Sequence, residues 1–186
     1  LNTNPCCGLQ ALVDLSTNKT KTFTVNDIVF QIGPRINASG RIDHAKDAVK
    51  LLISKSLQEA KDFSINIDDQ NNVRKDFDLR ITEEALAIID DNDSLKTRKS
   101  TVLYKSDWHK GVIGIVASRL TERYYRPTII LTETNGHIAG SCRSVIGFDL
   151  YEALSECSDL LDQFGGHKYA AGLTMQIENI KLFQFQ

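Results

Sequence analysis

Several features that often reveal a protein's function are scarce in these 186 residues. The chain has one methionine, one tryptophan and three prolines. No apolar run approaches the roughly 20 residues that a membrane-spanning helix needs, and no signal peptide opens the chain. We therefore expect a cytoplasmic protein without a membrane partner. Because the chain opens without an initiator methionine or a capped first element, we also expect a piece of a longer protein.

Metal-binding patterns are missing as well. Cys6, Cys7, Cys142 and Cys157 show none of the C-x-x-C spacing of a zinc site. The four histidines are far apart, and His167 has no carboxylate or second histidine near it in the sequence. We expect four reduced thiols and no metal site within the chain.

The charge balance also restricts the function. Acidic residues outnumber basic ones by 24 to 22, for a net charge of −2. This argues against a protein that coats nucleic acid over its whole surface, but leaves room for one localised basic groove.

Hydrophobic periodicity predicts a helical first part of the chain and a second part in which strands and helices alternate. Helical spacing covers residues 8–16 and 25–33. Gly33 and Pro34 then predict a break, and Asp43 is a candidate N-cap for a further helix. Residues 56–92 contain no glycine or proline and are mostly polar, which predicts one or two long exposed helices that act as a spacer. After residue 98, strand-like and helix-like segments alternate. The expected strands are 101–106, 127–132, 137–144 and 170–177, and the expected helices are 111–125, 149–164 and a last one from residue 178.

This alternation predicts an α/β fold with a mixed, partly parallel sheet and flanking helices, preceded by a long helical connector.

Four stretches could carry chemistry. In the first, GPRINASGR, Arg35 and Arg41 flank Asn37 just before the expected helix start. Arginine binds phosphate through two parallel hydrogen bonds, and a helix N-terminus offers free N–H groups. The stretch is therefore a candidate phosphate contact; the alternative is a loop whose arginines pair with carboxylates.

The second stretch, DWHKGVIGIVASRL, puts Trp108 and His109 at a strand-to-helix junction, followed by Gly111 and Gly114. Such glycines let a helix start approach a ligand or pack tightly on a sheet. A packing glycine pair with a capping histidine is the competing interpretation.

The third and fourth stretches lie in the C-terminal half. GSCRS brackets Arg143 with two hydroxyls at a strand end, which suits an anion but also suits a surface strand with an ordinary salt bridge. FGGHKYAAG places two glycines before His167, so it is either a tight turn or a place where the main chain approaches a phosphate.

Taken together and in this order, the four stretches resemble the C-terminal half of the RecJ single-strand-specific exonucleases of the DHH phosphoesterase superfamily. The resemblance implies three parts: residues 1–44 as the tail of the catalytic phosphoesterase domain, 45–98 as a helical connector and 99–186 as a DHH-associated domain. It implies a 5′-to-3′ exonuclease acting on single-stranded DNA with Mn²⁺ or Mg²⁺. The Asp-His-His triplet is absent, so the resemblance implies metal ligands elsewhere in the full-length protein and an inactive fragment.

The resemblance also implies which residues bind nucleic acid. Cys142 stands where the family more often has glycine or alanine. His167 is expected to position the substrate, and Trp108 and His109 are further candidates. The residues implied to contact nucleic acid are Arg35, Asn37, Arg41, Ser141, Arg143, Ser144, Gly165, Gly166 and His167.

Two alternatives remain open from sequence. One is an oligoribonuclease or cyclic-dinucleotide phosphodiesterase of the same superfamily, and the other is a non-catalytic nucleic-acid-binding module. The long connector and GPRINASGR favour the exonuclease.

Overall fold

The structure, a computed structural model, describes residues 1–16 and 22–184. The chain divides into two compact units, Leu1–Asp76 and Phe77–Gln186, called here unit 1 and unit 2. Each is described by itself. In the described residues, no helix is both long and apolar enough to cross a membrane.

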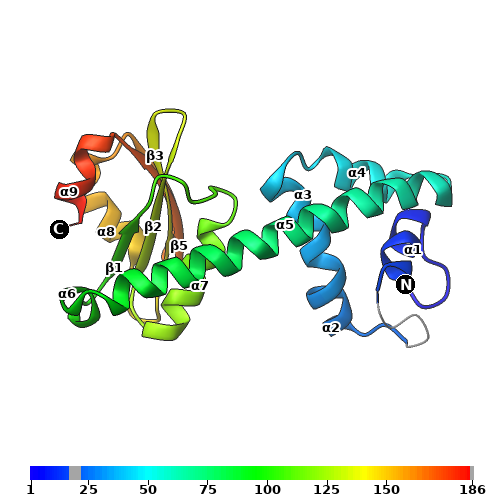
Figure 1. Cartoon of the computed structure of the whole chain (residues 1–186), viewed down its shortest axis with the longest axis horizontal. Coiled ribbons are helices and arrows are strands. Elements are labelled where there is room, and N and C mark those ends of the chain that lie inside the picture. Colours follow the sequence, from blue (N-terminus) through cyan, green and yellow to red (C-terminus); the bar gives the residue numbers. More distant parts are fainter. Residues whose placement is uncertain (17–21, 185–186) are drawn as a thin grey trace. The chain divides into compact units, whose positions relative to one another are not determined.

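Unit 1 is helical (Figure 1). It contains α1 (Cys7–Asp14), α2 (Val25–Asp27), the π-helix η1 (Ile28–Ile32), α3 (Gly33–Ile42), α4 (Lys46–Ile53) and the first part of α5 (Leu57–Asp90). Its small core includes Leu12, Ile32, Leu51 and Ile67, each at most 2% exposed.

A capping box starts the run of helix from α2 to α3. Thr24 Oγ1 accepts a hydrogen bond from Asp27 N–H, and the Asp27 carboxylate accepts one from Thr24 N–H. The run then continues through Gly33 and Pro34, where the sequence predicted a break. Pro34 lies in the first turn of α3, a position that tolerates a missing N–H. The expected loop over 33–41 is therefore wrong, because these residues are helical.

The expected N-cap at Asp43 is also wrong. Asp43 follows the last residue of α3 as its C-cap, with φ −142° and ψ −127°. The next helix, α4, begins at Lys46 after Ala45, which makes no side-chain cap. The helix start that the sequence placed directly after Asp43 therefore lies at Lys46.

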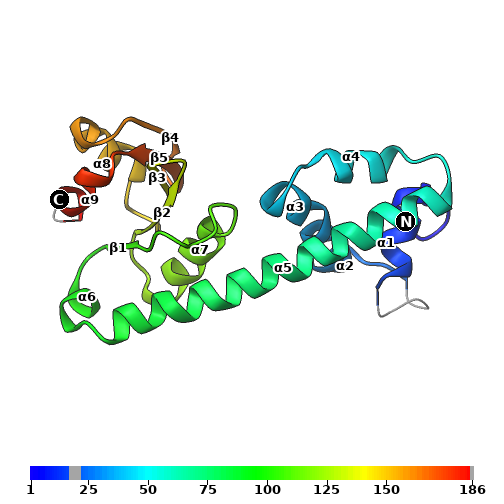
Figure 2. The same cartoon turned by 45° about the horizontal axis from the view of Figure 1, so that its top comes forward.

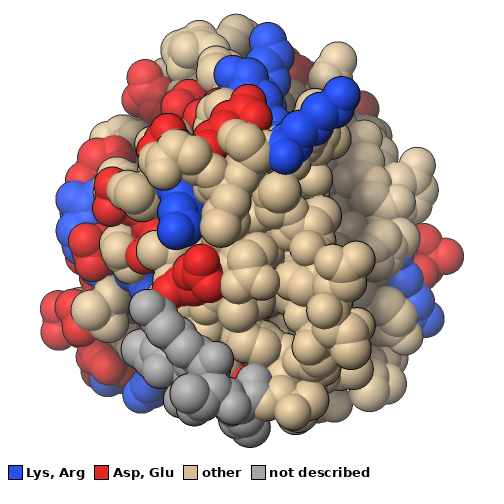
Figure 3. Space-filling view, turned by 90° about the vertical axis from the view of Figure 1, so that its right-hand side faces the viewer, with Lys and Arg blue, Asp and Glu red and all other residues tan. Residues whose placement is uncertain are grey.

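Unit 1 carries exposed apolar side chains. Val25, Phe30, Val49 and Ile53 are 74%, 74%, 56% and 69% exposed. Figure 3 looks onto unit 1 and shows a wide uncharged area, with lysine and arginine at its upper margin. Contiguous exposed apolar surface usually marks a contact area.

The long polar segment forms one continuous helix, α5, of 34 residues. It was expected to be exposed throughout, but several of its apolar side chains are fully buried. Ile67 belongs to the core of unit 1, and Ile81, Ala85 and Ile89 are buried in unit 2. Spacings of four residues place the last three on one helix face, which explains their common burial.

Unit 2 is an α/β unit. Besides the end of α5 it contains the short helix α6 (Asp93–Thr97) and a five-stranded sheet. The strands are β1 (Thr101–Tyr104), β2 (Thr128–Thr134), β3 (His137–Arg143), β4 (Gln163–His167) and β5 (Ala170–Met175), in the order β1-β2-β3-β5-β4. The strands β1 and β2 pair in parallel, and the other described pairs are antiparallel. The mixed, partly parallel sheet is confirmed.

Helices cover the two faces of the sheet differently (Figures 1 and 2). On one face lie α8 (Leu150–Glu156) and α9 (Ile180–Phe183), with the 3-10 turns η2 (Ser158–Leu160) and η3 (Ile177–Asn179). Leu131 and Leu173 pack there with Leu154 and Phe183. The other face carries α7 (Ile113–Tyr124), which contacts β2 and β3.

The strand β4 was not predicted. A helix was expected over 149–164, but α8 ends at Glu156 and residues 163–167 pair with β5. Two glycines and the pairing partner AAGLT favour a hairpin here, and this strand pairing outweighs the helical spacing of the preceding leucines.

Candidate nucleic-acid interface

The strand register of unit 2 brings the GSCRS and FGGHKYAAG stretches together. Ser141 on β3 lies opposite Gly172 on β5, which lies opposite Gly165 on β4. Residues directly opposite in neighbouring strands present their side chains to the same face. For this row it is the face covered by α7, because a Cβ added to Gly114 of α7 would lie 2.8 Å from Ser141 Oγ.

A groove of about 500 Å³ lies on this face where the outer strands are not covered. Its floor is low because Gly165 and Gly172 face each other without side chains. Lys110 and Ile113 line it from the start of α7, and Ser141 and Thr174 line it from the sheet. The groove is therefore open to a chain-like ligand that approaches the main chain closely.

The two glycines before His167 have different roles. Gly166 has φ +148°, and a Cβ there would lie 2.4 Å from Ala170 O, so the hairpin requires glycine at this position. A Cβ at Gly165 would meet nothing within 4 Å. Packing therefore does not explain Gly165, whereas a low groove floor does.

Arg143 and His167 do not line the groove, but they lie on the same sheet face, in the row next to Ser141 and Gly165. Each is opposite Ala170, on β3 and β4 respectively, so their Cα atoms are about 10 Å apart across two strand spacings. Arg143 Nη1 donates to Cys142 O (2.7 Å) and to Ser141 Oγ (3.3 Å). A Cβ at Gly114 would lie 3.1 Å from Arg143 Nη2, so this helix glycine makes room for the arginine.

His167 is exposed and presents one ring nitrogen to the surroundings. Its Nδ1 accepts a hydrogen bond from Tyr169 N–H (3.3 Å), which assigns the proton of the neutral ring to Nε2. Nε2–H can therefore donate to an oxygen of a ligand.

Backbone hydrogen bonds fasten the β4–β5 turn to the β3–α8 loop. Ser144 N–H donates to Tyr169 O (3.0 Å), and Leu150 N–H donates to Lys168 O (3.1 Å). The Ser144 hydroxyl donates to Phe148 O within the same loop (3.1 Å). Ser144 thus stabilises the loop, whereas Ser141 lines the groove.

Trp108 is buried, at 2% exposure, and cannot stack on a nucleobase. Its Nε1 donates to Glu84 of α5 (2.8 Å), which also accepts from Lys105 (2.7 Å). These two donors lower the pKa of Glu84, with the Lys105 hydrogen bond as the larger cause. The tryptophan therefore anchors the segment before α7 to α5.

His109 is partly buried and stacks on Phe77 of α5, with ring centroids 4.8 Å apart. Burial lowers its pKa, which favours the neutral ring. Its Nδ1 accepts from Gly111 N–H (3.1 Å), as expected of a capping histidine. The contacts of His109 therefore match the alternative from the sequence analysis, in which this histidine is a capping residue.

The candidates in unit 1 lie on α3. Arg35 is 16% exposed in its side chain and pairs with Asp68 of α5, with Nε 2.6 Å from Oδ1. Its Nη1 donates to Gln31 O (2.8 Å). Asn37 and Arg41 are exposed on the same helix. The contacts of Arg35 match the carboxylate-pairing alternative, although on a helix and not in a loop.

Sequence reasoning named only Ser141 and Gly165 among the residues that line the groove, and it missed Lys110, Gly172 and Thr174 among the others. Lys110 was visible as a cation directly before the glycine that precedes α7. Gly172 and Thr174 could be found only from the β3–β5–β4 register, which no local pattern predicts.

Metal ligands do not gather in the described part of the chain. Across residues 1–16 and 22–184, no three His, Cys, Asp or Glu side chains are placed as a metal site requires. The donor set within these residues does not fit the Mn²⁺ or Mg²⁺ that the resemblance implies for the full-length protein.

Comparison with known proteins extends this description. A family model described as the DHHA1 domain matches residues 98–184. The single-stranded-DNA-specific exonuclease RecJ of Bacillus subtilis is 41% identical over 175 residues, which are 93% of this chain and 22% of that protein. The protein of the same name from Haemophilus influenzae is 34% identical over 184 residues, 95% of this chain and 32% of that protein. The chain is a RecJ-family segment.

Solved RecJ structures share the fold. RecJ from Thermus thermophilus in complex with Mg²⁺ matches with a TM-score of 0.84 and 31% identity, over 96% of this chain and 27% of that one. Exonuclease RecJ bound to manganese matches with a TM-score of 0.82 and 30% identity, over 96% of this chain and 43% of that one. The RecJ-family segment described here thus spans 22% and 32% of the two curated relatives.

Proposed function

We propose that this RecJ-family segment holds single-stranded DNA in the groove of unit 2, as the substrate-clamping part of a 5′-to-3′ exonuclease. The observation that carries the proposal is the open floor formed by the row Ser141–Gly172–Gly165, with Arg143 and His167 in the next row of the same sheet face. The names of the relatives support the choice of single-stranded DNA over RNA.

The groove offers a set of donors suited to a phosphate. Arg143 supplies a charged fork, Ser141 a hydroxyl and His167 an Nε2–H donor. Charge-assisted hydrogen bonds of this kind are roughly twice as strong as neutral ones. Glycines on the floor let the sugar–phosphate chain approach the main chain, where a side chain would hold it off. These residues bind and orient the strand; they perform no hydrolysis themselves.

The metal-dependent step belongs to residues outside this segment. Mn²⁺ or Mg²⁺ would activate water and neutralise charge on the phosphorus in the full-length enzyme. Support comes from the Mg²⁺ and manganese complexes of the related RecJ structures.

The division into a catalytic-domain tail (1–44), a connector (45–98) and an associated domain (99–186) also remains a proposal. The DHHA1 match at residues 98–184 agrees with the last boundary. The exposed apolar side chains of unit 1, including Val49 and Ile53, would be covered if unit 1 belongs to a larger domain.

Arg143→Ala tests the phosphate clamp. Loss of a charge-assisted fork removes roughly 1.5–3 kcal/mol of binding free energy, about ten- to a hundredfold in affinity. We expect this loss for 5′-phosphorylated single strands and a smaller one for 5′-hydroxyl strands, measured by fluorescence anisotropy at low salt, where phosphate contacts count most.

Arg123→Ala is the matched control, because it removes an exposed arginine near the end of α7 that belongs neither to the groove lining nor to the strand row of Arg143 and His167. It should change both affinities little. Equal affinity of Arg143→Ala and the original chain for phosphorylated DNA would contradict the clamp. Tighter binding of RNA than of DNA strands would favour the oligoribonuclease alternative.

A further inference from the structure

A hollow of about 510 Å³ lies in unit 2 on the sheet face that carries α8 and α9, and we call it the α8 hollow (Figure 1). Val102 of β1 and Ile129 of β2, which are strand partners, line it from the sheet. Ile129 is followed by Ile130, which is opposite Ser141 of the groove. Because side chains alternate along a strand, the α8 hollow and the groove lie on opposite faces of the sheet.

The lining of the α8 hollow is mostly apolar. Leu150, Leu154 and Phe183 line it and are almost completely buried. Phe148 also lines it, but this large aromatic residue is 40% exposed. A bound side chain would cover that exposed apolar surface. Large apolar side chains that fill such pockets supply much of the binding energy at protein interfaces, so the α8 hollow suits the anchor side chain of a partner.

The chain beside the α8 hollow is acidic. Among the described residues that line it, Glu156 alone is charged. Between Arg143 and Lys168 the sequence has five carboxylates and no lysine or arginine. Two of these carboxylates are used within the chain, because Asp149 caps α8 and Asp162 accepts hydrogen bonds from a side-chain amide. Three carboxylates therefore remain for another role.

These three, Glu152, Glu156 and Asp159, are exposed and have no cationic partner among the described residues. Glu152 and Glu156 are four residues apart on α8, a spacing at which like charges destabilise a helix. Glu156 is also the last residue of α8, where the helix dipole disfavours a negative charge. Burial and, secondly, the charge of Glu156 raise the pKa of the Cys157 thiol, which lines the hollow. The field of Glu156 therefore reaches the lining.

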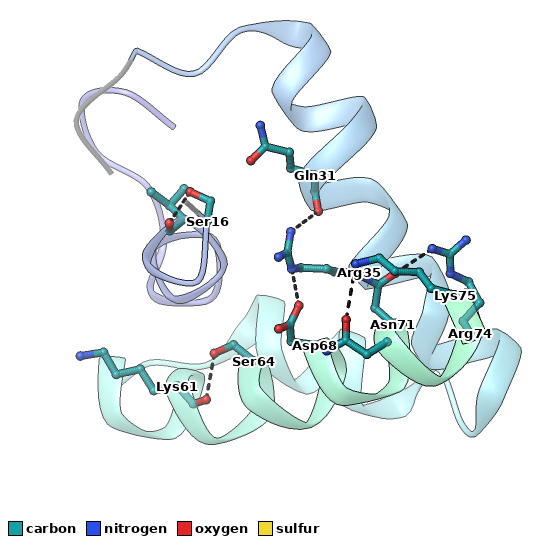
Figure 4. A network of polar contacts seen from close by, with 11 residues as sticks. Ser16, Gln31, Arg35, Lys61, Ser64, Asp68, Asn71, Arg74 and Lys75 are labelled. Atoms are coloured by element: carbon teal, nitrogen blue, oxygen red, sulfur yellow. Dashed lines mark hydrogen bonds and ion pairs between the residues drawn. The ribbon is translucent and has the colours of Figure 1, made fainter. Parts of the chain in front are cut away.

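Several carboxylates in other parts of the chain have a cationic partner. In unit 1 the Asp68 carboxylate accepts a hydrogen bond from Arg35, as Figure 4 shows. In unit 2 the Glu84 carboxylate accepts one from Lys105 (2.7 Å). The unpaired carboxylates of α8 differ from these, so they favour a cation that comes from another molecule, and they would repel the phosphates of a nucleic acid.

We propose that the α8 hollow binds a partner protein through an apolar side chain flanked by lysine or arginine. The apolar side chain fills the hollow, and the cations lie against Glu152 and Glu156, where they offset the repulsion within α8. The exposed cations Lys99, beside the lining residue Ser100, and Lys181 of α9 are not on α8, so the α8 side is where the partner's cations are expected. This proposal does not depend on DNA binding in the groove.

The test is a titration of the ¹⁵N-labelled chain with short peptides, followed by amide shifts. The first peptide has a tryptophan between lysines, the second has alanine in place of the tryptophan, and the third has glutamates in place of the lysines. We expect saturable shifts at residues 100–102 and 148–157 with the first peptide. The second and third should bind at least about tenfold more weakly, because each lacks one half of the recognition.

Variants of the chain locate the contact. Glu156→Lys should weaken binding of the first peptide about fivefold or more, because it replaces an exposed ion pair by a repulsion. Glu122→Lys is the matched control and should change binding little, since Glu122 is also exposed in the last turn of a helix but does not line the α8 hollow. Ala153→Phe fills the hollow from α8 and should abolish binding. Thermal unfolding checks that this variant folds, and Glu156→Lys remains decisive if it does not.

Four results would overturn the proposal. The first is no saturable shift around the α8 hollow with the tryptophan–lysine peptide. The second is equal binding of the alanine peptide, which would indicate attraction by charge alone. The third is an equal loss for Glu122→Lys and Glu156→Lys. The fourth is a concentration-dependent shift of the same amides without peptide, which would assign the hollow to a second copy of the chain.

Discussion

Replacing Gly165 by valine tests why this position is a glycine. Either the groove needs a low floor to bind a ligand, or the β4–β5 hairpin needs a small residue for packing. A Cβ at this position meets no atom within 4 Å, and the residue does not have a positive φ. Glycine inside a strand costs roughly 0.5–1 kcal/mol of stability relative to residues with a side chain, and valine favours strands. We therefore expect Gly165→Val to leave stability unchanged or to raise it by up to about 1 kcal/mol.

The same substitution should weaken DNA binding. The new side chain would stand on the groove floor opposite Gly172 and keep a phosphate away from Arg143 and Ser141. If one charge-assisted contact is lost, binding falls by roughly 1.5–3 kcal/mol, about ten- to a hundredfold. Gly165→Ala should give a smaller loss, and Gly172→Val a loss like that of Gly165→Val.

Thermal unfolding and anisotropy on a 5′-phosphorylated single strand measure the two effects on the same samples. Thr134→Val, at the end of β2 outside the groove lining, is the control for a valine placed in the sheet. Unchanged affinity of Gly165→Val at unchanged stability would refute the reasoning, because the floor would then have no part in binding. A strong loss of stability would refute the claim that packing does not require this glycine.

Three further predictions concern stability and reactivity. Arg126, 7% exposed, donates to the carbonyls of residues 95, 96 and 98 and to a threonine hydroxyl, so Arg126→Met should cost about 2–4 kcal/mol in urea unfolding and Arg126→Lys should restore only part of it. The pKa of Glu84 is lowered in the folded state, so its contribution is complete above its ordinary pKa of 4.5 and is lost as the pH falls below that value; urea unfolding of Glu84→Gln should lack this loss. Burial raises the pKa of the Cys142 thiol to about 12, so a thiol reagent at pH 8 should modify exposed Cys6 in the folded chain and Cys142 only after unfolding.

Local patterns in the sequence were sufficient for most elements of unit 2. Strands such as TVLY and TIIL are short apolar runs, and α7 has a clear apolar face, so the partly parallel sheet followed from their alternation. The break expected at Gly33–Pro34 failed because both residues are compatible with a first helical turn. Strand β4 was missed because it pairs with the adjacent strand β5 without an apolar periodicity of its own.

The site was predicted in part for the same reason. Ser141, Arg143, Gly165 and His167 were found as motif residues, but the sequence did not show that they share one face. It also treated the two glycines as a pair, whereas only Gly166 needs its positive φ. Trp108 illustrates the opposite error: an aromatic residue beside a histidine suggested a ligand contact, yet its indole is buried against Glu84.

The fastening of the β4–β5 turn has a consequence for motion. A short edge strand with two glycines is weakly held by its own ladder, and the turn is further secured by amide hydrogen bonds from Ser144 and Leu150. These two amides sit outside the hairpin but can exchange with solvent only when the turn moves away from the loop. We therefore expect the β4–β5 turn and the loop after Arg143 to open together. A DNA strand bound against the turn would then slow hydrogen exchange at the amides of Ser144 and Leu150, which it does not contact.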